Sequence, residues 1–394
     1  MREMYFLNDL GLVCPIGATP QEVTRRLFAG ESGVVPSDVY SPGRTLPVGM
    51  VDVPLPSLDD WPVDLRSRNN RLALAAVEQI RPAVEAAVAR YGADRVAVVI
   101  GTSTSGIGES EVAIRTLGDT GQLPADFHYA QQELNSPARF VARALGLRGP
   151  AQVHSTACAS SAKAMASAAR LIGMGVVDAA VTGGVDSLCA FTLAGFASLD
   201  LLSSRRCNPT SVNRDGINIG EGAALFLMTG EPAAVRLRGW GESTDGYHFS
   251  SPDPSGHGAR LAMEEALARA GVTARAVQYV NLHGTGTRQN DAMESAVVHA
   301  LLGDEIAVSS TKPLTGHTLG AAGAIEAAFC WLAMQDANTA GRLPPQLWDG
   351  VADPALAPLH AVAVGESLGR PPRVVLSNSF AFGGANATLL FGRE

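Results

Sequence analysis

Residues 151–173 read AQVHSTACASSAKAMASAARLIG and contain the plainest structural pattern in the chain. A short apolar run at 151–155 leads through a turn of small residues into an alanine-rich segment at 160–173. This order is typical of a buried strand followed by a helix. Cys158 lies in the turn, directly before the predicted helix. The positive end of a helix dipole favours a thiolate, so the pattern indicates a reactive cysteine, the alternative being a buried structural one.

The same alternation of short apolar runs and alanine-rich stretches continues on both sides and predicts an α/β protein. The turn-rich segment 229–233 separates two stretches of similar character, so we expect two halves, residues 1–230 and 231–394. Strands are predicted at 95–101, 178–184, 223–228, 277–282, 306–309, 373–378 and 387–391, and helices at 72–91, 258–270, 291–302 and 320–334.

The composition excludes several classes of protein. Hydrophobic residues make up 46% of the 394 residues and charged residues only 17%, which predicts large internal surfaces and excludes disorder. The formal net charge is −8 and no run of basic residues is present, so nucleic acid is a poor partner. The sequence contains no uninterrupted apolar stretch of about 18 residues, so no membrane span is expected.

The five cysteines indicate a reducing compartment. Their number is odd, they are widely spread and no CxxC pair is present, which argues against a disulfide framework and against a zinc site. The first residues lack the long apolar core of a signal peptide. We therefore expect a cytoplasmic protein without a bound metal.

A second motif, NLHGTGTRQNDAMES at 281–295, places His283 at the end of a predicted strand. The Gly/Thr loop that follows exposes its ring, although a lone histidine is as often satisfied structurally. Asp291 and Glu294 are three residues apart and share one face of the next predicted helix.

A third motif, STKPLTGHTLGAAGAIE at 310–326, contains Lys312, His317 and Glu326. The chain has only two lysines, and this one lies in a glycine-rich loop, where a lysine can hold a neighbouring group in place as a point charge. Neither GxxxxGK[ST] nor a dinucleotide fingerprint is present, so no nucleotide cofactor is expected.

The fourth motif, NSFAFGGANA at 378–387, has paired glycines that can turn a backbone N–H toward a ligand. Taken alone, it also fits a turn with two core phenylalanines. One cysteine, two histidines and glycine-rich backbone suit acyl transfer through a thioester, whereas a serine-hydrolase elbow and a metal-binding His pair are missing. The residues alone predict a cysteine-dependent acyltransferase.

At these four motifs the sequence resembles the β-ketoacyl-acyl carrier protein synthases of the thiolase superfamily, from GLVCPIG near the start to NSFAFGGANA at the close. The resemblance implies a thiolase-like five-layer αβαβα fold of two similar halves, a dimer and no cofactor. It also implies a decarboxylative Claisen condensation. Cys158 would take an acyl chain from its acyl carrier protein, and His283 and His317 would stabilise the enolate formed from malonyl-carrier.

The resemblance assigns further residues. The backbone N–H groups of Cys158 and Phe382 would form the oxyanion hole, and Phe382 matches a gating phenylalanine. Lys312 would orient the histidines, with Asp291, Glu294 and Glu326 behind it. Phe127, Phe191 and Phe196 are plausible lining residues of the acyl pocket. The carrier-binding positions of the family correspond to five arginines, for which a solvated basic face is the alternative: Arg66, Arg68, Arg71, Arg205 and Arg206.

Among these synthases the sequence looks most similar to ketosynthases of bacterial aryl polyene biosynthesis. In such systems the catalytic subunit pairs with a related chain-length-factor subunit that lacks the cysteine, and a homodimer remains an alternative here. Ala381 departs from the family pattern, which has glycine, and could stiffen the gate loop. Other interpretations are a housekeeping fatty-acid elongation synthase, a non-catalytic partner subunit, and a thiolase-like enzyme, for which Cys330 would have to be the second reactive cysteine.

Overall fold

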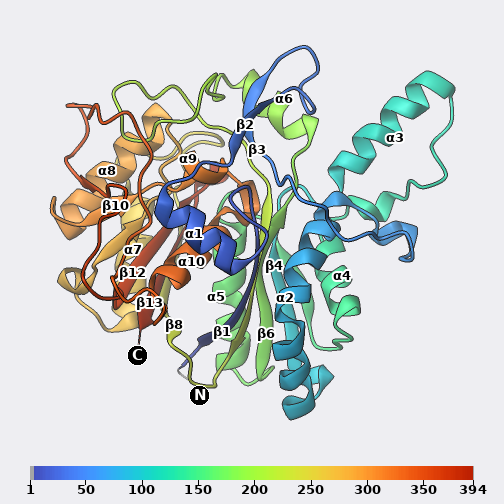
Figure 1. Cartoon of the computed structure of the whole chain (residues 1–394), viewed down its shortest axis with the longest axis horizontal. Coiled ribbons are helices and arrows are strands. Elements are labelled where there is room, and N and C mark those ends of the chain that lie inside the picture. The colour runs from blue at the N-terminus through green and yellow to red at the C-terminus, as the bar shows by residue number, and fades with distance from the viewer. Residues whose placement is uncertain (1–3, 394) are drawn as a thin grey trace.

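The computed structural model describes residues 4–393, and most of its strands form one mixed sheet through the middle of the molecule (Figure 1). The strand order across this sheet is β11-β10-β9-β12-β13-β8-β1-β7-β6-β4-β5. β2 (Val34–Ser37) and β3 (Leu46–Gly49) form a separate hairpin. The strands of the large sheet are β1 (Phe6–Val13), β4 (Val96–Gly101), β5 (Ala151–His154), β6 (Ala179–Asp186), β7 (Gly222–Thr229), β8 (Val235–Thr244), β9 (Tyr279–Asn281), β10 (Ala307–Ser309), β11 (His360–Ala361), β12 (Val374–Phe380) and β13 (Ala385–Arg393).

The two parts of this sheet repeat one topology. The first runs β1-β7-β6-β4-β5 and the second β8-β13-β12-β9-β10, with β11 added at the edge. In both parts the first two pairings are antiparallel and the next two are parallel. The parts meet where Phe6 pairs with Arg236. The two parts therefore share one topology, and the division of the chain into residues 1–230 and 231–394 stays a prediction.

The helices pack against the two parts of the sheet. α5 and α10 pack against each other and against strands of both parts of the sheet, whereas α2 and α4 cover the first part and α7 covers the second. α8 packs against α7. The helices are α1 (Pro20–Ala29), α2 (Arg68–Tyr91), α3 (Ile107–Thr120), α4 (Ser136–Ala144), α5 (Ser160–Gly173), α6 (Ala190–Ser198), α7 (His257–Ala270), α8 (Arg288–Leu302), α9 (Lys312–Thr315) and α10 (Ala322–Ala333).

Small residues allow the central helices to approach closely. A Cβ on Gly323 of α10 would lie 3.1 Å from the Cβ of Ala162 on α5. A Cβ on Gly101, at the end of β4, would lie only 2.2 Å from the backbone nitrogen of Ser161. The glycines therefore fix the start of α5, and the turn that holds Cys158, against the end of the sheet.

The predicted elements are present, with small shifts at their ends. α5 spans the residues predicted for it, and α2 begins at Arg68 rather than at residue 72 because Ser67 accepts a hydrogen bond from the Asn70 N–H as its N-cap. The expected helix at 320–334 is divided into a 3₁₀ turn and α10. None of the helices in residues 4–393 is both long enough and apolar enough to cross a membrane.

Candidate active site

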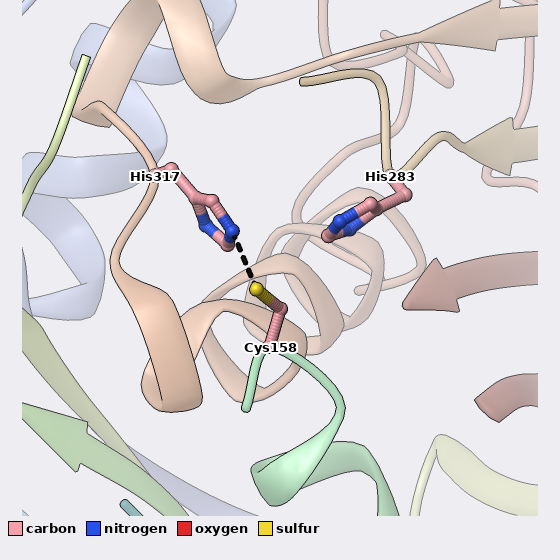
Figure 2. A group of neighbouring side chains, drawn as sticks. All are labelled: Cys158, His283 and His317. Atoms are coloured by element: carbon pink, nitrogen blue, oxygen red, sulfur yellow. Dashed lines mark hydrogen bonds between the residues drawn. The ribbon is translucent and has the colours of Figure 1, made fainter. Parts of the chain in front are cut away.

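Three side chains from distant parts of the sequence converge at one point (Figure 2). Cys158 precedes α5, His283 follows β9, and His317 lies between α9 and α10. The Cys158 Sγ and one ring nitrogen of each histidine lie within 4.8 Å of one another, and all three residues are buried. The two imidazole rings lie 5.4 Å apart, centre to centre, at 84°. The topology therefore assembles one group of reactive atoms from both halves.

The turn before α5 holds Cys158 in a fixed position. Ala157 has a positive φ of 48°, a strained conformation for a residue with a Cβ. The Ser160 hydroxyl stabilises this turn, because it accepts from the Thr156 N–H at 2.8 Å and donates to the Ala157 carbonyl at 2.6 Å. The sulfur consequently faces the histidines, and His317 Nε2 lies 2.9 Å from Cys158 Sγ.

The electrostatics keep all three groups neutral at rest. Burial raises the pKa of the Cys158 thiol to about 12, while the charge of Lys312 and the backbone N–H of Phe382 act in the opposite direction. Burial and Lys312 hold the pKa of both His283 and His317 well below the usual range. A neutral imidazole still carries one N–H, so each ring can donate one hydrogen bond to an oxygen.

A buried ion pair between Lys312 and Glu326 lies near the cysteine and the two histidines. Lys312 Nζ donates to Glu326 Oε1 at 2.5 Å, which links α9 to α10, and both side chains are almost fully buried. The pair keeps one positive charge near the cysteine and both histidines. That charge favours negative charge that develops on sulfur or on a bound oxygen.

The two carboxylates expected behind the histidines bind the backbone of the His283 loop rather than the rings. Glu294 accepts from the His283 and Gly284 N–H groups at 2.8 Å each, and burial raises its pKa to about 7. Asp291 accepts from Gly286 and Thr210 at 3.2 and 2.9 Å, and burial raises its pKa as well. Both residues therefore fix the position of the loop.

The sulfur opens onto a cavity of about 160 Å³. Phe196, Phe380 and Phe382 form apolar walls, and the Phe196 and Phe382 rings lie 5.5 Å apart. Ala381 is extended, with a φ of −100°, so its methyl group is accommodated without strain. Polar side chains, among them Thr285, Thr287 and Asn290, line the rest of the cavity, so it can hold both an apolar chain and a polar thioester beside the thiol.

The donor set also resembles a metal site, because one cysteine and two histidines can bind zinc. Ligand atoms on a tetrahedral zinc ion would lie about 3.5 Å apart. Cys158 Sγ and His317 Nε2 lie closer than this, at hydrogen-bonding distance. The geometry fits a thiol–imidazole pair better than a metal centre.

Comparison with known proteins assigns the chain to a family. Residues 10–233 match the N-terminal domain of β-ketoacyl synthases, and residues 234–347 match the C-terminal domain. The chain belongs to the β-ketoacyl synthase family. A 3-oxoacyl-[acyl-carrier-protein] synthase 2 from Rhizobium meliloti is 33% identical over 98% of both chains, and that from Synechocystis is 32% identical over 98% of this chain and 97% of its own.

Solved ketosynthases have the same fold. The ketosynthase ApeO from Xenorhabdus doucetiae, in complex with its chain length factor ApeC, has a TM-score of 0.93 and 42% identity, covering 100% of this chain and 98% of its own. A β-ketoacyl synthase from Burkholderia phymatum has a TM-score of 0.87 and 28% identity over the full length of both chains. The thiolase-like fold and the activity of a condensing acyltransferase are thereby confirmed.

The predicted carrier-binding arginines of this ketosynthase fall into two groups. Arg66, Arg68 and Arg71 line a groove of about 630 Å³ beside α3. Arg68 forms an ion pair with the buried Glu221 at 2.5 Å, and the other two donate to backbone carbonyls. Arg205 and Arg206 are exposed on the loop between α6 and β7. Their role in docking stays a prediction.

The phenylalanines suggested for the acyl pocket are also divided. Phe196 lines the cavity at Cys158. Phe127 lines the groove beside α3 instead, and Phe191 is 64% exposed on α6. The sequence placed neither α3 nor α6, so it could not show which ring points inward.

Sequence reasoning missed one charged residue of the ketosynthase, Asp186 at the end of β6. This fully buried carboxylate accepts hydrogen bonds from six N–H and O–H groups of Thr102, Ser103, Thr104 and Gly320, at 2.5 to 3.0 Å. It therefore links the loop after β4 to the start of the segment that follows His317. An aspartate directly after an apolar strand was the available sign.

Proposed function

We propose that this chain is the catalytic ketosynthase subunit, in which Cys158 forms the acyl thioester and the two histidines act on the malonyl group. The observation that carries the proposal is that the Cys158 sulfur and one ring nitrogen of each histidine lie within 4.8 Å of one another, at a cavity with phenylalanine walls. No other described cysteine lies in such a group. Cys330 is buried within α10 and belongs to no such group, so it does not supply the second reactive cysteine that the thiolase alternative needs.

The first half-reaction forms the thioester. The Cys158 sulfur attacks the carbonyl carbon of the acyl-carrier thioester, and the carrier leaves as a free thiol after taking up the cysteine proton. His317 Nε2, 2.9 Å from the sulfur, is placed to hold that proton during transfer. The backbone N–H of Phe382 faces the same sulfur, in a position to stabilise the oxyanion.

The second half-reaction forms the carbon–carbon bond. Malonyl-carrier loses carbon dioxide, and the electron pair of the broken bond forms an enolate whose oxygen accepts from His283 and His317. The enolate carbon attacks the acyl carbonyl, and the sulfur leaves as a thiolate that takes up one proton from solvent. The products are a β-ketoacyl-carrier, carbon dioxide and the free thiol.

An aryl polyene or related polyketide system is the proposed setting, with acyl carrier protein and a chain-length-factor paralogue as partners. The support is the similarity to ApeO, a ketosynthase solved with its chain length factor, together with the presence of Cys158. A homodimer is the alternative. The proposed place is the cytoplasm, where thiols such as the five free cysteines stay reduced.

Housekeeping fatty-acid elongation is the second candidate, because synthase 2 relatives are 33% identical over almost the whole chain. The purified chain alone, assayed with saturated medium-chain acyl carriers, separates the two. Efficient elongation without a partner supports the housekeeping role, and activity only with the paralogue supports the proposed one.

Intact-mass analysis tests the condensation. The wild-type chain and Cys158→Ala are mixed with acyl-carrier and then with malonyl-carrier. We expect an acyl adduct on the wild type only, discharged by malonyl-carrier to a ketoacyl product. An adduct of equal size on folded Cys158→Ala would contradict the assignment of the nucleophile.

A further inference from the structure

The short helix α6 is poorly anchored for an element that forms part of the active-site wall. It spans nine residues, of which only Leu193 is buried, and Phe191 is 64% exposed. Isolated helices of this length are unstable in water. Leu193 anchors the middle of α6 in a small apolar cluster with Ile217 and Ile219, and the remaining support comes from contacts at the two ends of the helix.

At the N-terminal end, a carboxylate from another helix provides the cap. The N-cap residue Cys189 makes no capping hydrogen bond with its side chain. Instead Glu111 of α3 accepts from the Ala190 N–H at 3.1 Å and from the Phe191 N–H at 2.6 Å. These N–H groups have no partner within the helix, and a negative charge beside them also complements the helix dipole.

At the other end, α6 reaches the reaction site. Phe196 packs against Phe382 with ring centres 5.5 Å apart, and both rings line the cavity at Cys158. This cavity, of about 160 Å³, is smaller than the pockets that usually enclose a drug-sized ligand. A short acyl chain fits within this space, whereas a long chain must extend past Phe196 and therefore depends on where that ring lies.

We propose that Glu111 is a positioning residue that fixes α6, and through Phe196 determines which acyl-chain lengths the cysteine accepts. The proposal rests on the proposed function, because it concerns the acyl chain on Cys158. Glu111 itself touches neither sulfur nor imidazole. α3, which carries it, projects from the body of the molecule in Figure 1, so the wall of the cavity is controlled from an outlying element.

The test compares Glu111→Ala and Glu111→Gln with Asp119→Ala, a substitution at an exposed position of the same helix. The enzyme is assayed in the assembly in which it is purified, with acyl carriers from the shortest to the longest accepted chain. We expect Glu111→Ala to lower kcat/KM about five-fold for the longest chain, as for a lost helix cap, and less than two-fold for the shortest. Glu111→Gln should lie between, and Asp119→Ala should match the wild type.

Two further readouts separate the possible failures. Hydrogen exchange of the α6 amides should be faster in Glu111→Ala than in Asp119→Ala, and carbon dioxide release from malonyl-carrier should stay unchanged. An equal loss of kcat/KM at all chain lengths, or unchanged exchange in α6, would overturn the positioning role. A wild-type enzyme that condenses no acyl chain would instead count against the proposed function.

Discussion

The two halves of the molecule have the same strand order and end in different loops. In the first half, the loop after β4 is held in place because the Ser103 and Thr104 N–H groups donate to the Asp186 carboxylate. The equivalent loop after β9 carries His283 toward the cavity, and Glu294 binds its backbone from α8. A buried carboxylate thus holds each loop, but only the second loop presents a reactive side chain.

The central helices show the same division. α5 follows Cys158, and α10, its counterpart in the second half, follows His317. The first half supplies the nucleophile Cys158 in the turn before α5, and the second half supplies both imidazoles. One topology used twice therefore gives two chemical roles, set by single side chains at equivalent strand and helix ends.

Breaking the ion pair of the second half should have the largest effect. Lys312→Met leaves Glu326 buried without its partner, which should cost about 3–5 kcal/mol of unfolding free energy. The double variant Lys312→Met/Glu326→Leu should recover most of this stability in urea titrations while condensation stays low. Equal stability of the single variant and the wild type would show that the pair is not a structural support.

Neutralising the two loop-binding carboxylates should sharpen the comparison. Asp186→Asn loses charge-assisted bonds and turns an amide toward N–H donors, at an expected cost of about 3 kcal/mol. Glu294→Gln should cost less, because its four donors bind a carboxyl whose pKa is already about 7. Thermal unfolding of both variants at pH 6 checks the order, and a larger cost for Glu294→Gln would contradict it.

The pKa of Glu294 also predicts a pH dependence of stability. The carboxyl has a pKa of about 7 in the folded chain, against 4.5 for an ordinary glutamate, so the native state holds the proton more tightly than the unfolded chain does. Stability from this group should therefore fall as pH rises from 5 to 8, by roughly 2–3 kcal/mol. The wild type should lose that amount relative to Glu294→Gln in urea titrations across this range. A difference that is constant with pH would show that Glu294 stays charged.

The smallest effect is expected at the surface. Arg205→Glu, on the exposed loop between α6 and β7, should raise the KM for acyl carrier a few-fold and leave the fold and the rate with a small acyl thioester unchanged. Steady-state kinetics and thermal unfolding check both. An unchanged KM would remove Arg205 from the docking surface.

Much of this architecture can be predicted from the sequence because it depends on local patterns. α5 has its predicted bounds, since its alanines favour a helix. The sequence also shows that Cys158, His283 and His317 each lie at the end of a predicted strand or in a turn or loop. Their mutual distances are not, because they depend on tertiary packing.

The sequence could not show the contacts of Asp186 or the Glu111 cap for the same reason. Asp186 meets Gly320 across 134 positions of sequence, and Glu111 meets Phe191 across 80. Neither contact has a local pattern. The arginines at 66, 68 and 71 show the opposite limit, since a basic cluster does not reveal that its guanidinium groups bind backbone carbonyls and Glu221.

The division of roles between the halves is tested most directly in His283→Ala. The acyl adduct on Cys158 is measured by intact mass, and carbon dioxide release from malonyl-carrier is measured on the same preparation. We predict an adduct like that of the wild type and a loss of carbon dioxide release of at least about 100-fold, because one of the two enolate-stabilising donors is gone. Loss of the adduct with carbon dioxide release intact would contradict the account.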